Sequence, residues 1–245
     1  MGICLKRFVM YNAHTELKYK PLMKQEVIDC LKLDMKICWE HFSQKLSSFT
    51  ADEKIIIFNN LSQLYDVSTD VKVKKATDAD YNALYYESGN PELNEFLQAM
   101  FDCFKSWQVY SDIELSKCLY AHTNRGTDNW FPVVIINQKI NEFQCAGELV
   151  TVYRGCHNTE LKTDKYKQRQ SWSTDFSVAK SFAYYHPSSD TPRNNRIVIK
   201  ATVNKESILW ARNAESEVVL ALDFTAKSVS TAMTYDDFIA QGGDA

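Results

Sequence analysis

The stretch Leu149-Val150-Thr151-Val152-Tyr153-Arg154-Gly155 lies in the second half of a chain of 245 residues. Its first five residues are β-branched, aliphatic or aromatic, the types that favour strands. Arg154 and Gly155 follow directly, where the strand is expected to leave the core. Further strand-like apolar runs after Trp130 are Val133–Ile136, Ile197–Val203 and Val218–Leu222. The second half is therefore predicted to be mainly β.

The first half is instead predicted to be helical, because its apolar residues recur at intervals of three and four. One helix is expected from Leu22 to Phe49. Thr50-Ala51-Asp52-Glu53 resembles a capping box, so a second helix is expected from there to about Leu64. Asn90-Pro91 offers a cap and a proline in the first turn, which predicts a third helix with one apolar stripe reaching Trp107.

This order of elements, helices first and strands second, predicts an α+β fold. We expect a single domain over residues 1–245, with a helical part at 20–130 and a β-rich part at 131–235. A short helix is expected near Ser177 to Tyr185. His186 to Asn195 has the composition of a loop.

Composition excludes several classes of function. The formal net charge of −3 gives no broad field for nucleic acid or an anionic membrane. No apolar run approaches the roughly 20 residues that span a bilayer, and the N-terminus lacks the apolar segment of a secretory signal. The seven cysteines and five histidines show no zinc-site spacing. Glycine-rich nucleotide-binding loops are also absent from the sequence. We therefore expect a cytoplasmic protein without a metal.

Three polar features mark the β half. Arg154-Gly155 ends a strand, where an arginine offers a planar fork to phosphate or ribose oxygens, unless it is simply solvated. Ser171-Trp172-Ser173 places two hydroxyls on one face of a strand, although it could also be a strand end before a capped helix. Glu215-Ser216-Glu217 places two carboxylates just before an apolar strand, which suits transfer chemistry; the alternative is an acidic solvated turn.

Taken together and in this order, these features resemble the Arg–Ser–Glu class of mono-ADP-ribosyltransferases, which includes bacterial toxins, phage enzymes and vertebrate ectoenzymes. Arg154 matches the family arginine, Ser171-Trp172-Ser173 its Ser-Thr-Ser element and Glu215-Ser216-Glu217 its Glu-x-Glu element. Ala179 and Phe182 match the alanine and aromatic residue that follow the serines. The resemblance covers residues 150–222, and a tryptophan replaces the usual central threonine of the second element.

The resemblance implies that NAD⁺ binds in a cleft between two small β-sheets. Arg154 would hold the ribose or diphosphate, and the backbone of Gly155 would bind the nicotinamide amide. Phe182, or else Tyr185, would stack on the nicotinamide ring. Arg193 would add a contact to the diphosphate.

The resemblance and the chemistry together imply roles for the acidic residues. Glu217 would accept a hydrogen bond from the ribose 2′-hydroxyl and stabilise the positive charge that develops when the nicotinamide–ribose bond breaks. Ser171, with Ser173 on the same face, would orient that carboxylate. Glu215 would bind the acceptor and help to remove its proton.

The acceptor stays open. Glu-x-Glu is similar to the motif of arginine modifiers, so a protein arginine is the first choice. The polar run from Lys162 to Arg169 could instead grip a nucleic acid, or water could be the acceptor in an NAD⁺ glycohydrolase. A non-catalytic binding module is a further alternative. The resemblance suggests a toxin, phage enzyme or defence factor that acts in the cytosol, its own or a host's, with a possible neutralising partner.

Overall fold

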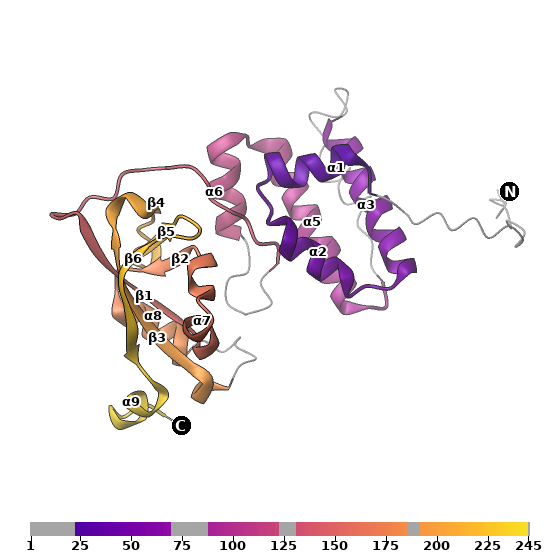
Figure 1. Ribbon diagram of the computed structural model, residues 1–245. Coiled ribbons are helices and arrows are strands. Elements are labelled where there is room, and N and C mark those ends of the chain that lie inside the picture. Colours follow the sequence, from indigo (N-terminus) through magenta and orange to yellow (C-terminus); the bar gives the residue numbers. More distant parts are fainter. Residues whose placement is uncertain (1–22, 70–87, 123–130, 186–191, 245) are drawn as a thin grey trace, which may run out of the picture.

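In the computed structural model, residues 23–69, 88–122, 131–185 and 192–244 are described. They form a mixed α/β fold in which a helical part and a β-sheet part lie side by side (Figure 1). The helical part contains α1 (Gln25–Asp29), α2 (Trp39–Ser47), α3 (Ala51–Thr69), α5 (Pro91–Val109) and α6 (Asp112–His122). The predicted order, helices first and strands second, is confirmed.

Two predicted helix starts are confirmed. The Thr50 amide donates to the Glu53 carboxylate at 2.8 Å, and the Glu53 amide donates to Thr50 Oγ1 at 3.3 Å, so that a capping box opens α3. Asn90 caps α5 by accepting from the Glu92 amide at 3.0 Å, with Pro91 in the first turn. Both caps satisfy amides that have no partner inside their helix.

The continuous helix predicted from Leu22 to Phe49 is wrong. The chain passes from α1 into a π-helical turn at Cys30–Asp34, and α2 begins only at Trp39. Between them Lys36 has a φ of 57°, in the left-handed region that breaks a helix. Ile37 then forms an isolated bridge with Val134, which is the only β-pairing in the predicted strand at Val133–Ile136 within the described residues.

The strands form one six-stranded antiparallel sheet in the order β4-β5-β2-β1-β3-β6. Their bounds are β1 (Leu149–His157), β2 (Ser171–Ser173), β3 (Arg196–Asn204), β4 (Ile208–Ala211), β5 (Glu217–Leu220) and β6 (Ala226–Met233). The sheet part also carries α7 (Asn158–Lys162), α8 (Phe176–Tyr184) and α9 (Tyr235–Ala240). The predicted runs at 149–153, 197–203 and 218–222 correspond to β1, β3 and β5.

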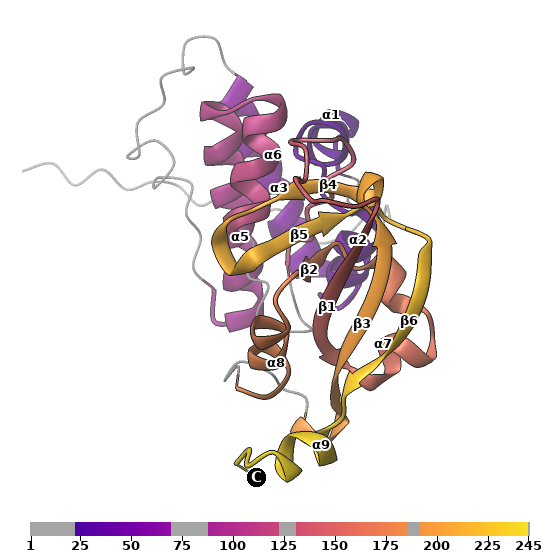
Figure 2. The same ribbon diagram turned by 90° about the vertical axis from the view of Figure 1, so that its left-hand side faces the viewer.

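Two separate sheets are not confirmed, but the single sheet has a narrow joint. β1 and β2 are paired at Tyr153 and Ser173, whereas β1 and β3 are paired along nine successive residues. In Figure 2, β4 and β5 run across the direction of β1 and β3. The sheet is thus divided into two halves, β4-β5-β2 and β1-β3-β6, that meet at this joint.

The helical part packs against the β4–β5 end of the sheet. Its core of buried apolar side chains from α3, α5 and α6 includes Val219 of β5, and Leu209 and Trp210 of β4 pack against it. Figure 1 shows α6 as the helix of this part nearest to β4 and β5. The helical part therefore brings side chains to the strand that carries Glu217. No described helix is long and apolar enough to cross a membrane.

Gly155 is required by the packing of α8 on β1. A Cβ at this position would lie 2.5 Å from the Ala183 nitrogen and closer still to the Ala179 carbonyl oxygen, both backbone atoms of α8. Gly155→Ala is therefore expected to lower the free energy of unfolding by about 3 kcal/mol through overpacking. Chemical denaturation measures this. Gly89→Ala is the matched control, because nothing lies within 4 Å of its added Cβ; equal losses in the two variants would contradict the packing role.

Candidate active site

Glu217 and Ser171 meet on one face of the β2–β5 pair. Ser173 lies opposite Glu217 and Ser171 opposite Val219, so that Ser171 and Glu217 are diagonal neighbours on the same face. Ser171 Oγ donates to Glu217 Oε1 at 2.7 Å. The Glu217 side chain is only 4% exposed. The sequence prediction that a serine of β2 orients this carboxylate agrees with the geometry.

Two further side chains reach the same carboxylate. Arg212, just after β4, forms an ion pair with Glu217 Oε2. Tyr120 of α6, which is fully buried, donates from its hydroxyl to Glu217 Oε1 at 3.3 Å. A buried carboxylate costs free energy unless it is paired and hydrogen-bonded. These contacts pair both oxygens of the Glu217 carboxylate and fix its position.

The Arg154 side chain extends from within β1, at the joint between the two halves of the sheet. The prediction that this strand ends at Arg154-Gly155 is wrong, because its pairing with β3 continues to His157. Its Nε and Nη2 donate to the two carboxylate oxygens of Glu160, at 2.9 and 3.3 Å. Its Nη1 donates to the Ser171 carbonyl at 2.9 Å. If the Tyr153–Ser173 register continued, Gly155 would lie opposite Ser171. The Arg154 guanidinium therefore donates to the Ser171 carbonyl in place of a backbone hydrogen bond from β1. Arg154 therefore fixes the residue that in turn holds Glu217.

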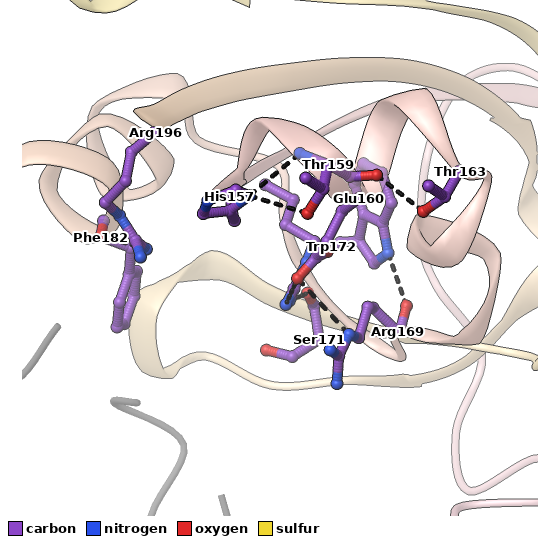
Figure 3. Close-up of polar contacts among 10 residues, drawn as sticks. His157, Thr159, Glu160, Thr163, Arg169, Ser171, Trp172, Phe182 and Arg196 are labelled. Carbon is purple, nitrogen blue, oxygen red and sulfur yellow. Dashed lines mark hydrogen bonds and ion pairs between the residues drawn. The ribbon is translucent and has the colours of Figure 1, made fainter. Parts of the chain in front are cut away.

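Glu160 anchors this arrangement from α7. In Figure 3 it points toward Ser171 and Arg169, and Arg169 Nε lies 3.4 Å from its Oε1. Burial by itself would raise the pKa of Glu160, but the charge and hydrogen bonds of Arg154, together with the charge of Arg169, lower it on balance. Glu160 is therefore ionised at neutral pH and pairs with two guanidinium groups.

The turn before β5 holds Glu215 in an uncommon conformation. Glu215 and Ser216 have φ angles of 58° and 47°, which cost non-glycine residues about 1–2 kcal/mol each. Ser173 Oγ donates to the Glu215 carbonyl at 2.8 Å, and the Thr174 amide donates to the Ser216 carbonyl at 3.0 Å. Ser173 thus supports the turn rather than the Glu217 carboxylate. The turn leaves the Glu215 side chain exposed, two residues before buried Glu217.

Trp172 lies on the opposite face of β2, as the alternation of a strand predicts. It is 2% exposed and packs edge-on against Tyr166 and Phe224. Its Nε1 donates to the Arg169 carbonyl at 2.8 Å. The residue that departs from the family motif therefore belongs to the core and does not enter the site.

The residues expected to hold NAD⁺ outside this cluster are less closely connected to it. Phe182 is half-buried on α8 and lies apart from Ser171 in Figure 3. Tyr185 is 52% exposed and packs edge-on against Phe238 of α9. Arg193 is exposed, and its Nη1 donates to the Asp244 carbonyl at 3.3 Å. The structure brings Arg154, Ser171 and Glu217 together through the Ser171 hydroxyl and carbonyl.

The polar run from Lys162 to Arg169 is partly engaged within the protein. Lys167 pairs with Asp164 at 3.0 Å, and Arg169 pairs with buried Glu160. Lys162 and Lys165 are exposed. Among the residues that the structure describes, no group of His, Cys, Asp and Glu side chains is arranged to hold a metal ion.

Three residues of the site were missed by sequence reasoning: Glu160, Arg212 and Tyr120. Arg212 carried a usable signal, because it precedes Glu217 by five residues across a short β-hairpin. Glu160 and Tyr120 carried none, since each reaches the site from a helix whose position depends on tertiary packing. Comparison with family models, with curated proteins and with solved structures found no match for the chain.

Proposed function

We propose that this chain is an NAD⁺-dependent mono-ADP-ribosyltransferase that uses Glu217 to cleave the nicotinamide–ribose bond. The observation that carries the proposal is the 2.7 Å hydrogen bond from Ser171 Oγ to the buried Glu217 carboxylate. It joins two of the three polar features of the sequence, and Arg154 joins the third through the Ser171 carbonyl. A single chain of contacts therefore links all three.

Glu217 suits the chemical step because its charge is buried and held in advance. Positive charge develops on the ribose as nicotinamide departs, and a fixed carboxylate in a water-poor site stabilises that charge more than one in bulk water. Ser171 holds one oxygen of Glu217, and Arg154 holds Ser171. This assigns Arg154 to positioning, in place of the diphosphate contact expected from the sequence, because Glu160 and Ser171 already engage its guanidinium.

We propose that the nicotinamide end of NAD⁺ binds at the joint of the sheet, where its two halves meet. Beyond Tyr153 the strands β1 and β2 separate, and Gly155 is the next residue of β1 on the same edge as Tyr153. The edge of β1 there is suited to binding an amide through backbone groups, as the sequence reasoning expected of Gly155. Phe182 and Tyr185 of the neighbouring α8 segment stay candidates for stacking.

Labelled NAD⁺ incubated with the chain and a cell extract tests the acceptor. We expect label on protein that is released by hydroxylamine, which identifies arginine. Label destroyed by nuclease would instead identify a nucleic acid, and free ADP-ribose alone would identify a glycohydrolase. Absence of all three products would contradict the proposed function.

Glu215→Gln separates transfer from cleavage. Because the Glu215 side chain is exposed beside Glu217, we expect it to take the proton of the acceptor, a role worth about 10²-fold or more in rate. The variant should lose transfer by that factor while NAD⁺ hydrolysis falls much less. Both rates are measured in one reaction with labelled NAD⁺. The release of labelled nicotinamide gives the rate of NAD⁺ cleavage, and the labelling of the acceptor gives the rate of transfer. If the rates of transfer and of NAD⁺ hydrolysis fell by the same factor, Glu215 would not be the residue that takes the proton of the acceptor.

A further inference from the structure

The helical part contributes a side chain to the candidate site. Tyr120 of α6 is fully buried, in the same apolar core as Val219 of β5. Leu115 and Leu119 of α6 are buried in that core as well, so the packing of the helix fixes the place of Tyr120. The Tyr120 hydroxyl then reaches Glu217 and donates to its Oε1 at 3.3 Å. A residue of the helical part is therefore built into the site that the sheet carries.

A second contact holds the Tyr120 ring. The ring packs edge-on against Trp210 of β4, with centroids 5.7 Å apart. The Cζ of Arg212 lies 5.0 Å from the centroid of the same Trp210 ring, and Arg212 forms the ion pair with Glu217. Aromatic pairs in this geometry add stability beyond the burial of their area. The four side chains close a ring of contacts that joins α6, β4 and β5 at the carboxylate.

The Glu217 carboxylate needs more than one donor to be held in a fixed plane. The last torsion of a glutamate side chain is broad, so a single hydrogen bond leaves the carboxylate able to turn. Ser171 Oγ donates to Oε1 from β2, and the Tyr120 hydroxyl donates to the same oxygen from α6. Arg212 pairs with Oε2. A carboxylate held from three segments of the chain is oriented before the substrate arrives, which is what electrostatic catalysis requires.

Building on the proposed function, we propose that Tyr120 is a positioning residue for Glu217 and that the helical part thereby completes the active site. The Tyr120 hydroxyl orients the carboxylate against the ribose. Because Tyr120 is fully buried, it acts through Glu217 and not through contact with NAD⁺ or the acceptor. The β-rich part by itself lacks one of the two donors to Oε1. The helical part is then a component of the catalytic unit and not a separate module.

Tyr120→Phe tests this role, because it removes the hydroxyl and keeps the ring against Trp210. A less well oriented carboxylate weakens stabilisation of the transition state more than binding of the substrate. The kcat for nicotinamide release should therefore fall about tenfold, while the KM for NAD⁺ stays within about twofold. Steady-state rates over a range of NAD⁺ concentrations give both values. An unchanged kcat, with or without a higher KM, would overturn the inference.

The matched control is Tyr184→Phe. Tyr184 is 1% exposed, its hydroxyl donates to the Met233 carbonyl at 3.2 Å, and its ring stacks on Phe238 of α9. The same buried hydroxyl is thus removed at the α9 end of the sheet part. This variant should lose stability but keep the kcat of the unchanged chain. Equal losses of kcat in Tyr120→Phe and Tyr184→Phe would reduce Tyr120 to a structural role and overturn the inference.

A stability measurement without NAD⁺ separates this inference from the proposed function. Glu217→Met keeps an unbranched side chain of similar volume but removes the carboxylate that accepts from Tyr120. Tyr120→Phe should therefore lower the urea midpoint of the unchanged chain more than that of Glu217→Met, since residues in contact are coupled. Equal decreases in the two backgrounds would overturn the inference whatever NAD⁺ does. Coupling in a chain that cleaves no NAD⁺ would instead retain the positioning of Glu217 and contradict the proposed function.

Discussion

Glu217→Gln is expected to lower the rate of nicotinamide release from NAD⁺ by about 10²- to 10³-fold, the usual effect of removing one preorganised electrostatic group. The amide keeps the shape of the side chain and can still accept from Ser171, but it carries no charge to stabilise the developing cation. Because both oxygens of Glu217 are held by neighbouring side chains, another group cannot easily take the place of its carboxylate. Initial rates of nicotinamide release at saturating NAD⁺ measure the effect.

The matched control for this variant is Glu206→Gln. Glu206 is an exposed glutamate that pairs with Lys139 at 3.0 Å, so the same chemical change is made away from the site. Its rate should equal that of the unchanged chain. If Glu217→Gln kept full activity while remaining folded, Glu217 would not be the catalytic carboxylate.

Arg154→Met is expected to lower the free energy of unfolding at pH 7 by about 3–5 kcal/mol, the cost of breaking a buried ion pair by removing one partner. Methionine keeps much of the side-chain volume but leaves Glu160, whose side chain is 5% exposed, with Arg169 as its remaining ion-pair partner. Urea denaturation measures the change. A loss below about 1 kcal/mol, the value typical of exposed pairs, would contradict the buried role of Arg154.

The same pair predicts a dependence on pH. The pKa of Glu160 is lowered in the folded protein, so its contribution to stability is present above its unfolded pKa and is lost as pH falls through the folded value. Below that value Glu160 is neutral with or without Arg154. The stability gap between the unchanged chain and Arg154→Met should therefore shrink as the pH is lowered below 4.5, the ordinary pKa of a glutamate. A gap that widened on acidification would contradict the assigned ionisation.

The strands that could be predicted are those made of apolar β-branched residues, such as Ile197–Val203. The strands β4 and β6 were not predicted from the sequence, for physical reasons. Ile208–Ala211 is short, and Ala226–Met233 is built from small and polar residues that stay largely exposed. The break near Lys36 depends on a pairing of Ile37 with a residue far along the chain, which local periodicity cannot show.

The candidate site could be predicted where its residues lie in or next to a strand. Arg154 and Glu217 each border an apolar run, and Ser171 belongs to a Ser-x-Ser alternation, so each could be assigned to a strand from the sequence. Tyr120 meets Glu217 across 97 positions of the chain, and only the packing of α6 on β4 brings them together. Glu160 appears in the sequence as one more charge in a polar segment, and its burial becomes visible only in the fold.

The most direct measurement of the central claim is the release of nicotinamide from NAD⁺ by the unchanged chain, followed by chromatography over a range of NAD⁺ concentrations without metal. Cleavage at Glu217 predicts release that saturates with NAD⁺ and that increases when agmatine, a small guanidine, is added as acceptor. A rate equal to that of NAD⁺ in buffer, at every concentration and with agmatine present, would contradict it.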